Sequence, residues 1–349
     1  MAVQVEEFRV SNDALDDAGE LRRRIDQDGY LFFRKLEDPD QLWALRLQLL
    51  SVCRDGGWLQ AGSALADGIA DVSRKCAEGD PEYLAVYNQV QKVEAFHRAG
   101  HWPVVLDVMA KLIGEPILPH PSKVARLWFP QHTLHTTPPH QDFVHFQGTY
   151  DTYTCWTPVG DCPRELGGLA VLPGSHKRRV IFDHHFALGA GGLGVDTAQF
   201  DGAWLSTDYE LGDALIFHSL TLHQALPNLT PDRLRLSLDN RYQALSQPIA
   251  EHQLRPHLSR ASGLTWEEVY AGWRSRDLQY YWRDLPLTVL ESDTSRQEGA
   301  FEEALRLARQ GNELARPLLV RVIKRDPGSA QATAAAAALR ELDATRPPA

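Results

Sequence analysis

The middle section of the chain carries a strand pattern that restricts the folds open to it. From about residue 123 to residue 243, short runs of apolar and β-branched residues are separated by turns rich in Gly, Pro, Asp and Asn. Many short strands with such turns are typical of the two packed sheets of a jelly roll. We therefore expect a mainly β fold with flanking helices, built on a double-stranded β-helix.

Helical patterns precede this core. Residues 12–26 and 38–55 have apolar residues at helical spacing, and they flank the apolar run Tyr30-Leu31-Phe32-Phe33, which predicts a short strand. A further helix is expected over 103–112, before the turn residue Gly114. These elements should cover part of the jelly roll.

The chain becomes helical again after residue 245. Residues 265–275 have an amphipathic helical pattern, residues 297–314 and 328–343 are strong helix formers, and none of the three carries a motif with chemical meaning. At 349 residues the chain suits one catalytic domain with an appendage. We expect a jelly-roll domain with N-terminal helices over 1–245 and a helical C-terminal extension over 246–349, which could cover the barrel, form a dimer interface or do neither.

Charge and cysteine usage restrict the partners. The net charge is -10, and a negative surface disfavours nucleic acid and anionic membranes, because both reward clustered Lys and Arg. The four cysteines include no Cys-x-x-Cys pair, residues 1–7 lack a signal-peptide pattern, and no apolar run approaches membrane-spanning length. We expect a protein of the reducing cytoplasm that acts on small molecules, and the sequence leaves its oligomeric state open.

Two metal-ligand side chains stand close together in Thr137-Pro138-Pro139-His140-Gln141-Asp142-Phe143. Alternate side chains of an extended strand share a face, so His140 and Asp142 should point the same way and could bind one metal ion together. They would supply two ligands of a possible three.

The third ligand is expected from the apolar run 212–223, where two histidines compete. His218 and His223 are five residues apart, so on a regular strand they face opposite sides and only one can face the pocket. We expect His223 to be the ligand and His218 to pack in the wall. The remaining histidines of this region are expected to be exposed or hydrogen-bonded rather than ligands: His132, His135, His145, His176, His184 and His185.

A site of two imidazoles and one carboxylate keeps open positions on one side of iron(II), which suits an oxo-acid cosubstrate and dioxygen. Strict alternation in residues 233–241 places Arg233, Arg235, Ser237, Asp239 and Arg241 on one strand face. A guanidinium binds a carboxylate bidentately, and a hydroxyl two residues on can add a hydrogen bond. Arg235 with Ser237 is the predicted clamp for the distal carboxylate of 2-oxoglutarate, whereas Asp239 and Arg241 could pair with each other at the strand end instead of touching any ligand.

Taken in order, these motifs resemble the phytanoyl-CoA dioxygenase family of Fe(II)- and 2-oxoglutarate-dependent oxygenases over roughly residues 20–245. The resemblance implies the jelly-roll fold, Fe(II) as cofactor and 2-oxoglutarate as cosubstrate. It rests on the run Asp26–Arg34, His140-Gln141-Asp142, Cys155-Trp156-Thr157-Pro158, the run Gly167–His176, Gly212-Asp213, His223 and the arginine strand.

Several roles are implied by position in the family. Lys92 resembles a lysine that reaches the 2-oxoglutarate, Trp156 resembles a tryptophan that lines the same pocket, and Gln141 should point away from the metal. The family's anchoring arginine stands at a spacing from the distal histidine that falls between Arg233 and Arg235. Both therefore remain eligible, and the arginine-any-serine pattern favours Arg235.

The resemblance implies an enzyme that uses dioxygen to oxidise, and preferably hydroxylate, a C–H bond of a small organic molecule, with release of succinate and carbon dioxide. Asp142 disfavours halogenation, because a related halogenase needs a small residue in its place; desaturation and cyclisation stay open. Two alternatives use the same fold: a zinc-dependent hydrolase with the same three ligands, and a noncatalytic jelly-roll binding protein. Hydrolysis gives no reason for the Arg235/Ser237 pair or for Lys92.

A glycine-rich segment interrupts the strand pattern. Residues 187–200 contain four glycines, too many for a stable helix or strand. We expect a loop there, either a mobile one near the pocket mouth or an inert one on the surface.

Overall fold

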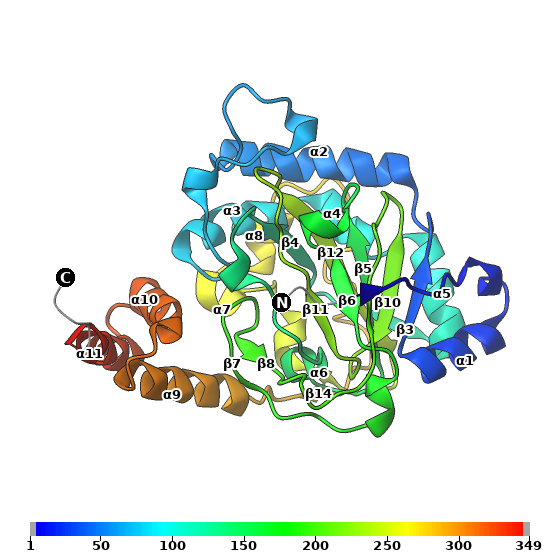
Figure 1. Cartoon of the computed structure of the whole chain (residues 1–349). Helices are drawn as coiled ribbons and strands as arrows, with labels where there is room; N and C mark the ends of the chain where they lie inside the picture. Colours follow the sequence, from blue (N-terminus) through cyan, green and yellow to red (C-terminus); the bar gives the residue numbers. More distant parts are fainter. Residues whose placement is uncertain (1–4, 345–349) are drawn as a thin grey trace.

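Two facing sheets form the centre of the molecule in the computed structural model, which describes residues 5–344 (Figure 1). The first four residues, part of the segment without a signal-peptide pattern, and the last five lie outside the described range. The larger sheet has the order β2-β10-β5-β12-β3, with β4 beside β12, and the smaller has the order β1-β9-β6-β11. The predicted jelly roll is confirmed.

The strands of the two sheets are short, apart from β12. The larger sheet consists of β2 (Tyr30–Phe33), β3 (Ile117–Pro119), β4 (Val124–Trp128), β5 (Thr152–Pro158), β10 (Ala214–His218) and β12 (Arg235–Ala244). The smaller consists of β1 (Val5–Glu6), β6 (Leu169–Val171), β9 (Trp204–Leu205) and β11 (His223–Ala225).

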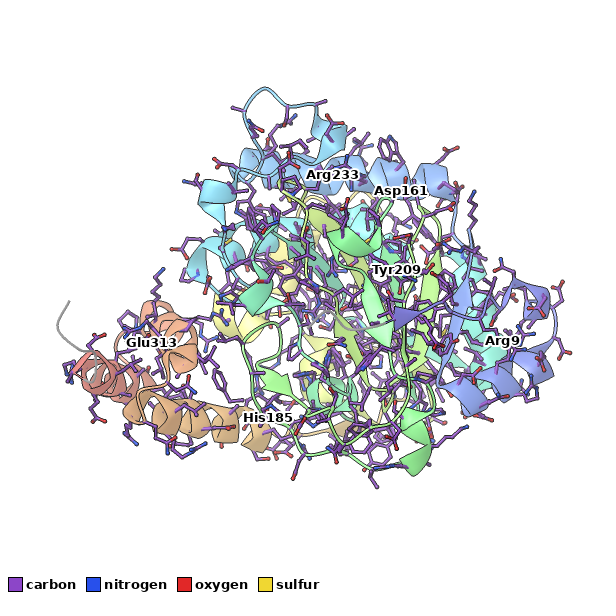
Figure 2. All side chains as sticks on the ribbon, viewed as in Figure 1. Arg9, Asp161, His185, Tyr209, Arg233 and Glu313 are labelled. Carbon is purple, nitrogen blue, oxygen red and sulfur yellow. The ribbon has the colours of Figure 1, made fainter. Side chains whose placement is uncertain are left out.

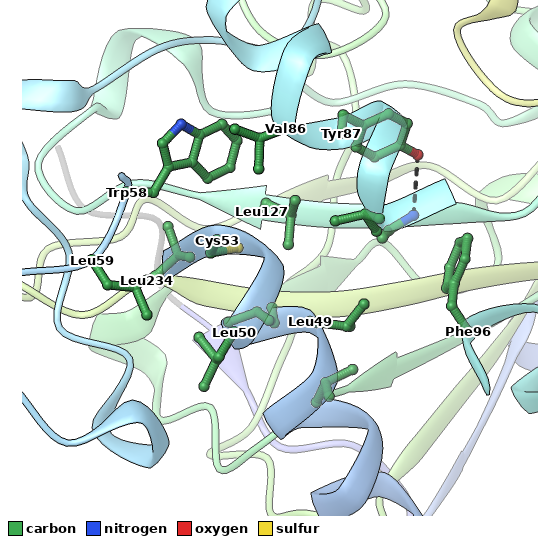
Figure 3. Close-up of a cluster of buried hydrophobic side chains, with 14 of the residues drawn as sticks. Leu49, Leu50, Cys53, Trp58, Leu59, Val86, Tyr87, Phe96, Leu127 and Leu234 are labelled. Atoms are coloured by element: carbon green, nitrogen blue, oxygen red, sulfur yellow. Dashed lines mark hydrogen bonds between the residues drawn. The ribbon is translucent and has the colours of Figure 1, made fainter. Parts of the chain in front are cut away.

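Strand β12 divides the molecule into an inner and an outer side. Its inner face carries Arg235, Ser237, Asp239 and Arg241, which point between the sheets, and all are buried. Its outer face carries leucines that pack against α2 (Pro39–Asp55) and α3 (Pro81–Gln91). Figure 3 shows this apolar cluster, where the Tyr87 hydroxyl accepts a hydrogen bond from the Ala125 amide at 3.3 Å. The alternation predicted from the sequence is confirmed for residues 235–241 but was wrong for Arg233, which lies ahead of the strand and is exposed.

The covering helices begin and end where their capping residues stand. Helix α2 begins after Asp38, whose carboxylate accepts the amides of Asp40 and Gln41, and α5 (Pro103–Ile113) ends at Gly114 with a φ of 74°. Helix α1 (Ala18–Asp28) begins later than predicted, because residues 12–14 form a separate 3-10 turn.

Two helices of the N-terminal half were not predicted: α3 and α4 (Glu94–Ala99). Across residues 5–344, helices contain more residues than strands, so the expectation of a mainly β fold was wrong for the chain as a whole. It describes the jelly-roll core alone. The reason is that helical segments cover one side of the larger sheet and follow it in the chain.

The segment after residue 245 packs against the jelly roll in two parts. Helix α8 (Trp266–Tyr270) lies over Leu118 of β3, and β13 (Ile249–Ala250) pairs with β14 (Val289–Leu290). A boundary at residue 245 stays a prediction. Among residues 5–344, no helix combines the length and the apolarity needed to cross a bilayer.

The last three helices form a small bundle beside the barrel (Figure 1). They are α9 (Ser295–Arg309), α10 (Arg316–Arg325), which was not predicted, and α11 (Ala330–Ala344). Their apolar cluster includes Phe186 of β7 (His185–Phe186), which pairs with β8 (Leu193–Gly194). Figure 2 shows His185 close to the start of this bundle. The bundle is therefore joined to the jelly roll through the glycine-rich segment.

A carboxyl group is enclosed on the outer side of β5. Glu37 is buried, and its Oε1 accepts a hydrogen bond from Thr157 Oγ1 at 2.7 Å. Burial raises the pKa of Glu37 to about 7, although the hydrogen bonds from Thr157 and Cys155 oppose the rise. As the pH rises from about 4.5 to about 7, the unfolded chain loses this proton before the folded chain does, and the folded state loses stability.

We expect Glu37→Gln to remove this pH dependence, because the amide keeps the Thr157 hydrogen bond and carries no charge. At pH 8 the variant's free energy of unfolding should exceed that of the wild type by up to about 3 kcal/mol, and the difference should vanish near pH 4.5. Urea unfolding at several pH values measures it. Glu302→Gln on the exposed side of α9 is the matched control. A difference in free energy of unfolding between Glu37→Gln and the wild type that does not change with pH would contradict the raised pKa of Glu37.

Candidate metal centre

The three predicted ligands come together between the sheets. The ligand atoms of His140, Asp142 and His223 all lie within 4.8 Å of one another, and the three residues are buried. Asp142 Oδ1 is 3.6 Å from His140 Nε2 and 3.5 Å from His223 Nε2. Two nitrogens and one oxygen therefore face a common point, which is the donor set expected of a facial metal site.

A pair of backbone hydrogen bonds places the two imidazoles side by side. The His140 amide donates to the His223 carbonyl at 3.0 Å, and the His223 amide donates to the His140 carbonyl at 3.1 Å. Residues that exchange both hydrogen bonds lie directly opposite in an antiparallel pair, with their side chains on the same face. The ring centroids are consequently 4.2 Å apart.

The other ring nitrogen of each histidine faces a backbone carbonyl. His140 Nδ1 lies 2.8 Å from the carbonyl of Pro138, and His223 Nδ1 lies 3.0 Å from the carbonyl of Thr221. A carbonyl only accepts hydrogen bonds, so each Nδ1 carries the proton and each Nε2 keeps its lone pair. Both lone pairs are then available to a metal.

The chain reaches this geometry by a different route from the one expected. Asp142 is not in a strand: it has φ -57° and ψ -32° and opens the one-turn helix α6 (Phe143–Phe146). The run 212–223 is not one strand either, because β10 ends at His218 and a turn precedes β11. The alternation argument was therefore wrong in both segments, although it selected the residues that converge.

His218 lies away from the cluster, as expected. Its Nε2 is 3.1 Å from Asp151 Oδ1, and its Nδ1 accepts the Leu220 amide. Gln141 turns away from the metal ligands, which agrees with the expectation for it, and its side-chain amide bonds to the Val180 and Leu220 carbonyls and to the Phe182 amide.

The second oxygen of Asp142 is held by two inner-face side chains. Thr154 Oγ1 donates to Asp142 Oδ2 at 2.5 Å, and Arg241 donates to the same oxygen through Nη2 at 3.2 Å. These bonds leave Oδ1 turned toward the imidazoles. Arg241 forms the expected ion pair with Asp239, at 3.6 Å, and it also pairs with Asp142, which the sequence did not predict.

Sequence reasoning missed Thr154 and the role of Arg241. Alternation along residues 233–241 put Arg241 on the inner face, but no local pattern shows that Asp142 lies opposite it. Thr154 faces Arg241 across the β5–β12 register, a pairing that only the folded sheet creates.

The electrostatics favour ligands in the metal-binding form. Burial by itself raises the pKa of Asp142, but the charge of Arg241, followed by the neighbouring imidazoles, lowers it well below its ordinary value. Burial and the nearby His223 lower the pKa of His140. The carboxylate is therefore ionised and His140 neutral at physiological pH.

The predicted clamp for 2-oxoglutarate also lies on the inner side. The Arg235 guanidinium lies 5.7 Å from the Trp128 ring and donates to the Gly167 carbonyl, and burial lowers its pKa to about 10. Among the described residues, Arg235 Nε, Ser237 Oγ and Trp156 Nε1 are buried polar atoms without a hydrogen-bond partner. Buried groups of this kind normally have partners, so these are fitted to receive an acceptor group.

A cavity of about 10 Å³ adjoins Arg235, which is smaller than 2-oxoglutarate. Admission of a keto-diacid to this position therefore requires the surrounding side chains to move.

Two other residues that were predicted to contact 2-oxoglutarate lie away from the inner face of β12. Arg233 is exposed ahead of β12, and Figure 2 shows it on the side of α2. Lys92 caps the C-terminal end of α3, where its carbonyl accepts the Trp273 indole N–H and its charge acts on Glu268. Neither residue lines the cavity that contains the metal ligands.

A pocket of about 520 Å³ opens onto His140 and Asp142. Its near wall contains Phe146 and His145, whose ring is 5.3 Å from that of His140. The glycine-rich loop contributes Gly189 to Gly192 to the lining, so its position near the pocket agrees with the expectation, and its mobility stays a prediction. At Gly191 a Cβ would lie 2.6 Å from the His145 ring, and only glycine allows the loop to approach so closely.

The model of one protein family, Phytanoyl-CoA dioxygenase (PhyH), matches residues 25–236, which is more than half of the chain. The chain belongs to the phytanoyl-CoA dioxygenase family. The resemblance inferred from the motifs is confirmed, and the family's catalytic class, a dioxygenase, is that of this protein.

Several known proteins resemble this chain over most of their length. The 1-deoxypentalenic acid 11-beta-hydroxylase of Streptomyces arenae is 28% identical over 255 residues, which cover 69% of this chain and 87% of that protein. A probable phytanoyl-CoA dioxygenase of Caenorhabditis elegans is 23% identical, and the matched residues cover 61% of this chain and 71% of that protein. The structure of the non-heme alpha ketoglutarate dependent carbocyclase SnoK from nogalamycin biosynthesis aligns with a TM-score of 0.48 at 20% identity, covering 67% of this chain and 87% of that chain.

We expect His223→Ala to abolish Fe(II) binding by this dioxygenase, because it removes one of the three convergent donors. His218→Ala is the matched control, since the same truncation there removes the contacts with Asp151 and with the Leu220 amide and none of the three convergent donors. Anaerobic Fe(II) titration followed by calorimetry measures both. Equal loss in the two variants would show that His223 has no special role.

We also expect Thr154→Val to weaken Fe(II) binding about ten-fold, because the isosteric valine cannot hold Asp142 Oδ2. Thr152→Val is the control on the same strand face, since the Thr152 hydroxyl donates to the Thr149 carbonyl and not to a ligand. The same titration applies, and a Thr154→Val affinity equal to that of Thr152→Val would contradict the role assigned to this hydroxyl.

Proposed function

We propose that this protein is an Fe(II)- and 2-oxoglutarate-dependent dioxygenase that hydroxylates a C–H bond of a small organic molecule. The observation that carries the proposal is the convergence of His140, Asp142 and His223, two of which, His140 and Asp142, line a pocket large enough for a small-molecule substrate. The 1-deoxypentalenic acid 11-beta-hydroxylases among its relatives favour hydroxylation over the other outcomes open to the family.

The donor set fits iron(II). Two neutral imidazole nitrogens and one carboxylate oxygen would hold the ion from one side, and the pocket side would remain open. When bound, iron(II) with 2-oxoglutarate and dioxygen supplies the oxidising chemistry, and succinate and carbon dioxide are the coproducts. The protein provides orientation of the ligands and a buried site that limits access of water.

Arg235 and Ser237 fit the distal carboxylate of 2-oxoglutarate. With a pKa of about 10, Arg235 is charged at neutral pH, and its unpaired Nε and the Ser237 hydroxyl can both donate to the same anion. The indole N–H of Trp156, on the neighbouring strand β5, is a third buried donor without a partner in the described chain. Arg233 and Lys92 take no part in this proposal, because their side chains lie outside the inner face.

The test is anaerobic addition of Fe(II) and then 2-oxoglutarate, followed by the weak visible charge-transfer band of the complex. We expect the band to form in the wild type. We expect Arg235→Ala to raise the 2-oxoglutarate concentration needed for half of the signal roughly 10- to 100-fold, because hydrogen bonds to a charged group contribute about 1.5–3 kcal/mol.

Arg233→Ala is the matched control, an arginine two residues away whose loss should leave the titration unchanged. The reverse result would transfer the anchor to Arg233. Absence of the band in the wild type would contradict the proposal, because a zinc-dependent hydrolase or a noncatalytic binding protein has no such complex. Succinate release coupled to a panel of small metabolites then identifies the primary substrate.

A further inference from the structure

The helical bundle at the C-terminus forms the outer wall of the pocket that contains the metal ligands. Helix α9 contributes Phe301 to the lining, and α10 contributes Leu318, Arg321, Val322 and Arg325. The family model ends at residue 236, so this wall lies outside the part of the chain that it matches. In Figure 1 the bundle lies on the side of the barrel where β7, β8 and α7 (Ser259–Ser262) are found.

Polar contacts hold this wall in place. The Glu303 carboxylate on α9 accepts the Phe186 amide of β7 at 2.7 Å, and Arg321 on α10 forms an ion pair with Asp80 ahead of α3 at 2.8 Å. Phe186 also packs in the apolar cluster of the bundle. Because the contacts reach both the glycine-rich loop and α3, the wall spans the pocket from two sides.

Two of the arginines that line the pocket are neutralised within the protein. Arg126 is held by Glu78 at 2.5 Å and by Asp239 at 3.0 Å. Arg321 is held by Asp80. Because protein carboxylates compensate their charge, these two guanidiniums stabilise the pocket wall and are not available to bind a substrate anion.

The other three arginines carry an excess of positive charge. Arg255 and Arg260 share one carboxylate, Glu251, at the long distances of 3.7 and 3.5 Å. The exposed side chain of Arg325 has neither an ion pair nor a hydrogen bond with any other part of residues 5–344. Partial burial, followed by the charge of Arg321, lowers the pKa of Arg325. Three carboxylates line the same pocket. Glu78 and Asp142 are paired with Arg126 and Arg241, and Glu298 accepts the Thr294 hydroxyl.

The pocket is thus divided into two chemical environments. Its apolar lining consists of Phe146, Leu258, Phe301, Leu318 and Val322, and its charged lining consists of arginines on α10 and around α7. The excess of positive charge occurs in a chain whose net charge is -10, so it is a local property of this surface. A focused positive potential in an otherwise acidic protein attracts anionic small molecules.

We propose that the primary substrate is an amphiphilic acid, with an apolar body against Phe301, Leu318 and Val322 and an anionic group, a carboxylate or a phosphate, held by Arg325 with Arg260 and Arg255. The anionic end is bound at the outer wall, and the apolar body extends toward His140 and Asp142. Oxidation of that body rests on the proposed function, whereas the binding of the anion does not.

The test is calorimetric binding of three ten-carbon probes, decanoate, decyl phosphate and decanol, to the full-length protein loaded anaerobically with Fe(II) and 2-oxoglutarate. We expect at least one of the two anions to bind about ten-fold or more tightly than decanol, and tighter binding of decyl phosphate or of decanoate identifies the anionic group. Arg325→Ala should reduce the affinity for that anion about ten-fold and leave decanol unchanged, because it removes a charge and little apolar surface. Arg325→Lys should restore part of the loss.

The matched control is Arg340→Ala, which removes an exposed arginine of α11 that does not line the pocket and should change no affinity. Equal binding of acid and alcohol, binding of none of the probes, or an unchanged anion affinity in Arg325→Ala would overturn the inference.

Repeating the binding with metal-free protein separates this inference from the proposed function. If the Fe(II)/2-oxoglutarate band is missing but Arg325 still governs anion binding, the dioxygenase proposal fails and the anion site stands. If the band forms and Arg325→Ala binds the anions as the wild type does, the anion site fails and the dioxygenase proposal stands.

Discussion

The proposed metal centre depends on a single backbone pairing, the two hydrogen bonds exchanged by His140 and His223. These residues come from distant parts of the chain, and the pairing makes them direct neighbours with their rings on one face. The carbonyls of Pro138 and Thr221 then orient the rings. The backbone pairing fixes where the two side chains start, and the carbonyl contacts of both Nδ1 atoms hold the ring orientations, which is the support that a preorganised metal site requires.

Buried charges extend from this centre in alternating order. Asp142 contacts Arg241, Arg241 approaches Asp239, Asp239 binds Arg126, and Arg126 binds Glu78. Each charge removed from water is compensated by a neighbour of opposite sign, so the series tolerates a burial that would be costly for any isolated member. The same series keeps Asp142 ionised and fixes its second oxygen. Stability of the inner sheet and readiness of the metal ligand therefore have one physical cause.

The two ends of the pocket are built by different parts of the chain. The jelly roll supplies His140 and Asp142, whereas the C-terminal helices and the segment around α7 supply the outer lining. Such a division allows the reaction chemistry to remain constant while the outer wall sets which molecules are admitted. The glycine-rich loop lies between them and joins the bundle to the barrel through Phe186.

The sequence by itself determined the jelly roll and the alternation that turns Arg235 and Ser237 inward, because strand period is a local property. It also identified the three convergent side chains, through their types and their order in the motifs. It could not show that Asp142 is aimed by a helical turn, that β10 and β11 are separate, or that Lys92 and Arg233 lie outside, since spacing along a strand does not reveal where the chain turns. Thr154, Arg241 and the wall formed by α9 and α10 were decided by the tertiary structure alone. Each depends on a partner from a distant segment, and only the packing of the sheets and helices brings those segments into contact.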